Sequence, residues 1–106
     1  MRASAALQLL GDDTRRAIVE QLAAGPLAVG DLARRLPVSR PAVSQHLGAL
    51  KAAGLVTDQA VGTRRIYRLD PAGLDLLRTY LDRMWASALE GYQDAIELTD
   101  DKERPS

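Results

Sequence analysis

The chain of 106 residues contains no cysteine and no phenylalanine, and it has a single tryptophan and a single histidine. Without cysteine it can form neither disulfides nor thiolate metal sites, and it has no cysteine nucleophile. Without phenylalanine, the core has to be built mainly from leucine, valine, isoleucine and alanine. At this length we expect one domain with a modest core, at a size where self-association often adds stability.

Long apolar runs are also missing. No stretch approaches the roughly 18 uncharged apolar residues that a membrane span needs, and the apolar stretch near the first residue is too short for a signal peptide. We therefore expect a cytoplasmic protein without membrane contact. The sequence offers no Ser/His/Asp set, no phosphate-binding glycine loop and no paired acid and base, so we predict that it is not an enzyme.

The charges are balanced in number but not in position. The formal net charge is zero, yet residues 1–69 hold ten basic and five acidic side chains, whereas residues 70–106 hold four and nine. Such asymmetry favours one part that faces the phosphates of a nucleic acid and an acidic part that stays away from them. The alternative is an acidic tail that only aids solubility.

Two short helices separated by a turn are expected in the middle of the chain. The first covers about residues 29–36, and the second is opened by Ser39, whose hydroxyl can accept a hydrogen bond from the first turn. Pro41 falls in that turn, where proline is tolerated, and Gly54 is expected to end the helix in a left-handed conformation. This spacing predicts a helix-turn-helix unit, whose second helix enters the major groove in DNA-binding proteins.

The second helix has two different faces. Its narrow apolar stripe predicts core contacts and consists of Val43, Leu47 and Leu50. The opposite face presents short or hydrogen-bonding groups: Pro41, Ser44, Gln45, Gly48 and, near the N-terminal edge, Arg40. Such groups allow close approach to base edges and paired hydrogen bonds with them. The alternative for this pattern alone is an ordinary amphipathic helix with a solvated polar face.

Two β-rich runs, 55–60 and 65–69, follow this helix directly. They are joined by a tip at 61–64, which places Arg64 beside Arg65. We expect a hairpin wing whose arginines reach the DNA backbone. Together these elements predict DNA binding, and the alternative is a winged-helix module for protein–protein contact with weak DNA binding.

Three further helices are expected towards the ends of the chain. They cover about residues 3–10, residues 14–24 with Asp13 as the cap, and residues 71–97 with Asp70 as the cap. The fold class is then mainly α, a winged helix-turn-helix in the order of four helices, two strands and a fifth helix. One domain spans residues 1–99, and residues 100–106 are expected to form a disordered acidic tail.

The last helix has an apolar surface too wide for one small core. A heptad-spaced set, Leu74, Leu77, Leu81, Met84 and Ala88, is widened by Leu76, Tyr80, Trp85, Leu89, Tyr92 and Ile96. Because the aromatic members would otherwise be exposed, we predict a homodimer that pairs the terminal helices. Its expected interface residues are Ala3, Leu7, Leu10, Leu77, Leu81, Met84, Trp85 and Ala88. The alternative is a long helix packed only on its own domain.

The segment DLARRLPVSRPAVSQHLGALKAAGLV and the following QAVGTRRIYRLDP resemble the arsenic-repressor (ArsR/SmtB-type) family of bacterial winged-helix regulators, over about residues 7–85. The resemblance implies a homodimeric transcriptional repressor that binds an inverted-repeat operator in double-stranded DNA. The family's contacts carry over to Arg40, Pro41, Ser44 and Gln45 on the helix and to Thr63, Arg64 and Arg65 on the wing. We add Ser39, His46 and Lys51 to this predicted DNA-binding set.

The chain departs from that family at its metal sites. The family's thiolate site reads Leu-Cys-Val-Cys-Asp-Leu in the third helix, whereas residues 27–32 read LAVGDL here. The family's other site needs histidine on the last helix, and this helix has none. We therefore expect no classical metal site and no cofactor. The alternatives for an inducing signal are a small molecule, an accessory protein, an unconventional metal site or none.

Two smaller features have alternative explanations. His46 lies between the apolar stripe and the outer face, where it can contact a phosphate, sense pH or pack at the flank of the helix. Glu90, Asp94 and Glu97 share one helical face, and carboxylates so placed can hold a hard cation. A solvated acidic face is the commoner meaning of that spacing.

Overall fold

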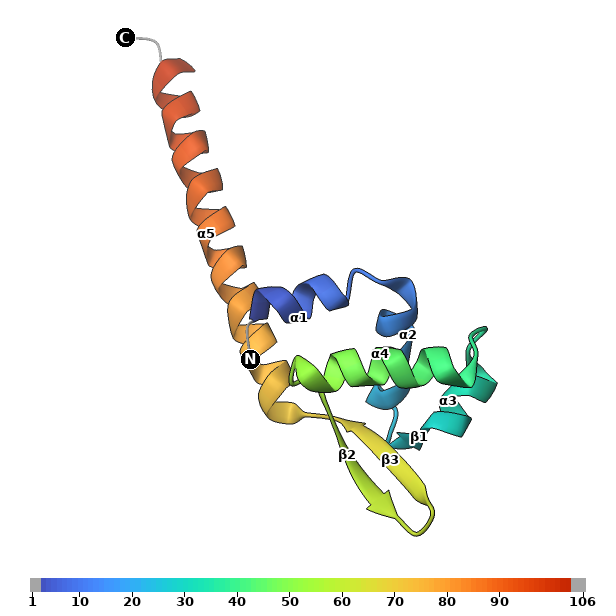
Figure 1. Cartoon of the computed structure of the whole chain (residues 1–106). Helices are drawn as coiled ribbons and strands as arrows, with labels where there is room; N and C mark the ends of the chain where they lie inside the picture. Colours follow the sequence, from blue (N-terminus) through green and yellow to red (C-terminus); the bar gives the residue numbers. More distant parts are fainter. Residues whose placement is uncertain (1–2, 104–106) are drawn as a thin grey trace.

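The computed structural model describes residues 3–103, with side chains described for residues 3–96. Its elements are α1 (Ala3–Leu9), α2 (Asp13–Ala23), β1 (Leu27–Ala28), α3 (Val29–Arg35), α4 (Arg40–Ala52), β2 (Val56–Val61), β3 (Arg64–Leu69) and α5 (Pro71–Glu103). The first four helices and the sheet pack together, and α5 leaves this body as a long rod (Figure 1). The predicted fold class, a mainly helical winged helix-turn-helix, is confirmed.

Helix α2 begins one residue earlier than the sequence predicted, because Asp12 rather than Asp13 caps it. The Asp12 carboxylate accepts a hydrogen bond from the Arg15 N–H at 2.9 Å, and this bond is the main cause that lowers the pKa of Asp12. Asp13 is instead the first helical residue and forms a surface ion pair with Arg16 at 2.6 Å. The helix buries Ile18 completely and ends at Ala23.

The predicted features of α4 are confirmed. The Ser39 hydroxyl accepts a hydrogen bond from the Ala42 N–H at 3.3 Å, which satisfies an unpaired donor of the first turn. The stripe of Val43, Leu47 and Leu50 is fully buried and forms the centre of the core. Gly54 has a φ of +81°, a conformation that suits glycine and turns the chain from the helix into β2.

The sheet has one strand more than predicted. Its order is β1-β3-β2, and β1 pairs through Leu27 with Tyr67 and through Ala28 with Ile66. A strand of two residues is too short to show an alternating pattern, so no periodicity in the sequence indicates it. The wing strands β2 and β3 are joined by Gly62 and Thr63 alone, a tip two residues shorter than expected.

Helix α5 starts as predicted and runs further than predicted. The Asp70 carboxylate accepts from the Ala72 N–H at 3.0 Å, and Leu77 is buried in the core of its own chain. The helix ends at Glu103 rather than near 97, so residues 100–103 of the predicted tail are helical and residues 104–106 lie outside the described part. The proposed domain limit at residue 99 stays a prediction.

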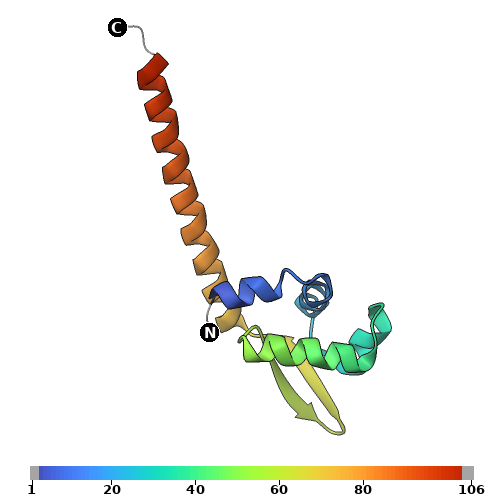
Figure 2. The same cartoon turned by 45° about the horizontal axis from the view of Figure 1, so that its top comes forward.

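The described side chains in the outer part of α5 are open to solvent. Every described side chain from Leu81 to Ile96 is exposed, and Figure 2 shows this part of the helix extending beyond α1. Only the first turns of α5 pack on the body, beside α1. Within residues 3–103, no helix is both long and apolar enough to cross a membrane.

Candidate nucleic-acid interface

The face of α4 opposite the buried stripe is exposed, as predicted. It carries Arg40, Pro41, Ser44, Gln45 and Gly48. A Cβ added to Gly48 would meet nothing within 4 Å, so the space above this position is open. Burial of the stripe fixes the rotation of the helix, and this face therefore presents its short and hydrogen-bonding groups to an external partner.

Asp31 ties the wing to α3. Its carboxylate accepts from Arg64 Nη2 of the wing at 2.6 Å and from the Ala28 N–H at 3.1 Å, and it also pairs with Arg34 one turn further along α3. The hydrogen bond from Ala28 and the charges of Arg64 and Arg34 outweigh partial burial and lower the pKa of the Asp31 carboxyl. Asp31 is consequently an anion at neutral pH.

Asp58 ties the same wing to the end of α4. Its carboxylate lies 2.7 Å from Lys51 Nζ and 2.8 Å from Arg65 Nη1, and 7% of the side chain is exposed. Hydrogen bonds from Lys51 and then Arg65 lower the pKa of Asp58. Lys51, Arg64 and Arg65, all predicted DNA contacts, are therefore each paired with an aspartate in this structure.

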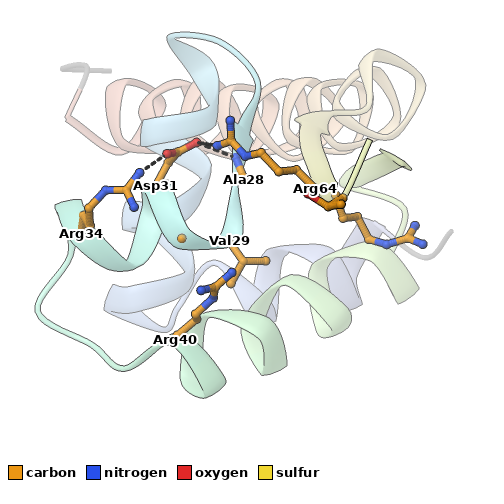
Figure 3. A pocket seen from close by; sticks show the side chains of 9 residues that line it. Ala28, Val29, Asp31, Arg34, Arg40 and Arg64 are labelled. Atoms are coloured by element: carbon orange, nitrogen blue, oxygen red, sulfur yellow. Dashed lines mark hydrogen bonds and ion pairs between the residues drawn. The ribbon is translucent and has the colours of Figure 1, made fainter. Parts of the chain in front are cut away.

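A hollow of about 470 Å³ lies between the start of α3, the start of α4 and the tip of the wing. Four arginines line it: Arg34, Arg40, Arg64 and Arg65. Figure 3 shows Asp31 between the guanidinium groups of Arg34 and Arg64. A Cβ added to Gly30 would lie 3.6 Å from Arg34 Nη1 and 3.7 Å from Arg40 Cζ, so both arginines pass over this glycine.

The other residues singled out in the sequence differ in their exposure and in their partners. Thr63 is exposed at the wing tip. His46 is half-buried, and its Nδ1 accepts from Arg15 Nε at 3.2 Å, which places it against α2 at the flank of α4. Glu90 and Asp94 are exposed, while the side chain of Glu97 lies outside the described part. Among the described side chains, no group of three or more histidines or carboxylates is placed to hold a metal ion.

The sequence did not reveal the roles of Asp31, Arg34 and Asp58. Asp31 stands three residues after Ala28, a spacing at which an acidic residue commonly bonds the start of a helix, but its partner Arg64 is 33 residues away. A helix-turn-helix with an exposed polar face, next to a wing rich in arginine, defines a winged helix-turn-helix protein of the DNA-binding type.

Comparisons with known proteins agree with this class. Residues 12–58 match the family described as bacterial regulatory protein, arsR family. The chain is 66% identical over 96 residues to the HTH-type transcriptional regulator Rv2034 of Mycobacterium tuberculosis, which covers 91% of this chain and 90% of the relative. It is 36% identical over 90 residues to the arsenical resistance operon repressor of Escherichia coli, covering 84% and 77%.

A solved structure extends the similarity to the whole fold. The ArsR-like transcriptional regulator from Rhodococcus sp. RHA1 is 35% identical, with a TM-score of 0.77 over 92% of this chain and 91% of that chain. The chain therefore belongs to the ArsR family of DNA-binding transcriptional regulators. This family consists of regulators rather than enzymes, as the sequence predicted.

Proposed function

We propose that the protein is a homodimeric transcriptional repressor that acts in the cytoplasm and binds an inverted-repeat operator in double-stranded DNA. The observation that carries this proposal is the exposed face of α4 beside the arginines of the wing. In a two-fold dimer the two α4 helices would lie about one DNA turn, roughly 34 Å, apart. Each chain would then read one half of the repeat.

We assign some of the exposed groups to the bases of the DNA and others to its phosphates. Gln45 can form paired hydrogen bonds with an adenine edge, and Arg40 can do the same with guanine. Arg64 and Arg65 can contact phosphates, which contributes affinity that does not depend on sequence. Lys51 in the last turn of α4 is paired with Asp58 of the wing, so we assign it to contacts with the DNA backbone rather than with the bases.

The dimer proposal is supported by the uncovered face of α5. Trp85 is 68% exposed and Tyr92 is 65% exposed, with Leu81, Met84 and Leu89 exposed along the same helix. An apolar surface of this extent marks an interaction site, and a two-fold axis would pair the face with itself. Leu77 contributes to the core of its own chain instead, while Ala3 and Leu7 on α1 and Leu10 just after it are half-buried and would extend the interface.

The test begins with selection of duplexes from a random pool by the purified protein. We expect an inverted repeat, and we expect Gln45→Ala to weaken binding to it by about 1–3 kcal/mol per half-site while hardly changing binding to random duplex. Gln59→Ala is the matched control, because Gln59 lies on β2 rather than on α4 and accepts a hydrogen bond from Arg68 at 3.0 Å. Equal losses on both duplexes would assign Gln45 to positioning on the backbone.

One observation favours the alternative of a protein–protein module. The cations Arg64, Arg65 and Lys51 are all paired with two aspartates, Asp31 and Asp58, and a wing whose charge is partly neutralised in this way would attract DNA less strongly. Such a module would bind duplex DNA weakly and without dependence on salt. A repressor instead loses affinity steeply as salt concentration rises, because bound counterions are released from the DNA.

A further inference from the structure

We propose that the hollow between α3, α4 and the wing is the seat of one DNA backbone phosphate, and that Asp31 occupies it with its own carboxylate while the protein is free. The inference rests on the proposed function, since it assumes that duplex DNA is the partner. It adds Arg34 to the DNA contacts and gives Asp31 a role in setting affinity.

The hollow is lined by more positive than negative side chains. Arginines from three different segments converge on it, from α3, α4 and the wing. Of the residues that line it, all in the described part of the chain, Asp31 is the one acid. Its two oxygens are taken by Arg34, Arg64 and the Ala28 N–H. Arg40 has no ion pair among those found between described residues, so the hollow keeps an excess of positive charge.

A DNA phosphate can take the place of the Asp31 carboxylate, because the two anions offer the arginines the same kind of acceptor. A phosphodiester and a carboxylate each bear one negative charge and two oxygens that accept from guanidinium groups. The rigid fork of an arginine suits either anion. A DNA phosphate that approaches between α4 and the wing therefore finds donors that Asp31 already holds in place. Arg34 and Arg64 can pass from the carboxylate to the phosphate without a large movement of the backbone.

Two consequences follow for binding. Asp31 keeps the arginines oriented in the free protein, which lowers the entropy cost of ordering them on DNA. It also competes with the phosphate, because it remains as a negative charge next to the bound anion. We expect the competition to dominate, so that Asp31 weakens binding to operator and random duplex alike.

The first experiment removes the charge of Asp31. Asp31→Asn is chosen because the amide oxygen can still accept from the Ala28 N–H and keep the start of α3. We expect tighter binding to random duplex, by about twofold to fivefold per half-site. The matched control is Asp13→Asn, which removes the same charge from an aspartate that also pairs with the arginine three residues on but lies outside the hollow. Equal changes for both variants would overturn the inference.

The second experiment removes one of the donors. Arg34→Gln should weaken binding and reduce the slope of log affinity against log salt by about 0.9 for each phosphate that the protein no longer neutralises. Arg35→Gln is the control from the same turn of α3, since Arg35 bonds Gln21 of α2 at 3.3 Å instead of lining the hollow. A slope that is unchanged in Arg34→Gln, or reduced equally in both variants, would contradict the assignment.

A third arm separates DNA from a free anion. Calorimetric titration of the wild-type protein with inorganic phosphate should give no binding at submillimolar concentration, and a tight stoichiometric site would assign the hollow to a free anion instead. These experiments also separate a failure of the proposed function from a failure of the phosphate inference. If the wild-type protein does not bind duplex DNA, the proposed function fails, whereas unchanged variants of a protein that does bind refute only the role of Asp31.

Discussion

The backbone of Gly73 rests against the carbonyl group of Gly54. A Cβ added to Gly73 would lie 1.8 Å from the Gly54 oxygen and 2.8 Å from its carbonyl carbon. The nearby N–H of Asp70 donates to the Leu55 oxygen at 2.9 Å. The first turn of α5 is therefore in direct backbone contact with the residues that follow α4, so the proposed dimer helix packs directly beside the end of the proposed DNA-reading helix.

This contact predicts the effect of a single methyl group. Gly73→Ala should lower the free energy of unfolding by about 1–3 kcal/mol, because backbone has to move to admit the side chain. The control is Gly91→Ala in the same helix, where a Cβ meets nothing within 4 Å and alanine should add about 0.5–1 kcal/mol. Urea unfolding followed by circular dichroism measures both. Equal stability of Gly73→Ala and the wild type would show that the backbone moves there at no cost.

The cap of α2 predicts part of the acid sensitivity. The folded-state pKa of Asp12 is lowered from 3.8, mainly by the Arg15 N–H. The stabilisation from the ionised carboxylate is therefore complete above this ordinary value and is lost as pH falls through the lower folded value. Asp12→Asn keeps a capping oxygen without the charge, so its stability should fall less between about pH 5 and pH 3. Asp12→Ala, which loses the cap, should be less stable at every pH, and a steeper acid loss in Asp12→Asn would contradict this assignment.

The chain has no cysteine, and its one histidine, His46, lies outside the last helix. We therefore predict that the protein is regulated without a classical metal site. After exhaustive chelation the protein should keep its fold and its affinity for the selected operator, and stoichiometric zinc, cadmium or arsenite should not change that affinity. Fluorescence anisotropy with a labelled duplex measures the effect. A tight divalent-metal site coupled to DNA release would refute the prediction and direct attention to Glu90, Asp94 and Glu97.

Because the apolar face of α5 is exposed in the single chain, we expect that a charge placed on it prevents dimerisation without unfolding the monomer. Leu81 is 42% exposed in the single chain, so Leu81→Glu should leave the monomer folded. It should nevertheless abolish the dimer, because a charge in an apolar interface costs several kcal/mol. Thr79→Glu adds the same group about 200° around the helix and should leave the dimer intact. Light scattering reports the mass, and a dimeric Leu81→Glu protein would exclude this face as the interface.

The parts of the fold that follow from local rules were predictable. Ser39, the buried stripe of α4 and Gly54 act through neighbours within a few residues, and each was found in its predicted role. The choice between Asp12 and Asp13 as the cap was not predictable, since both residues are of the same type and suit the position equally. In this case the backbone at Asp12 is extended and the helix starts at Asp13.

The rest depends on contacts between distant segments. Strand β1 exists because Leu27 lies beside Tyr67, and no local pattern indicates that pairing. In the same way, the aspartate that holds the wing tip comes from α3, on the far side of α4 in the sequence. The width of the apolar surface on α5 could be predicted from the sequence, and the exposed Trp85 agrees with that prediction.

The decisive test of the dimeric repressor is sedimentation velocity of the wild-type protein, alone and with a duplex that carries the selected sequence. We expect a dimer at micromolar concentration and one dimer on each inverted repeat, with no stable complex on a duplex whose two half-sites are scrambled. A monomer in solution, a single chain on the duplex or equal binding to the scrambled duplex would contradict it.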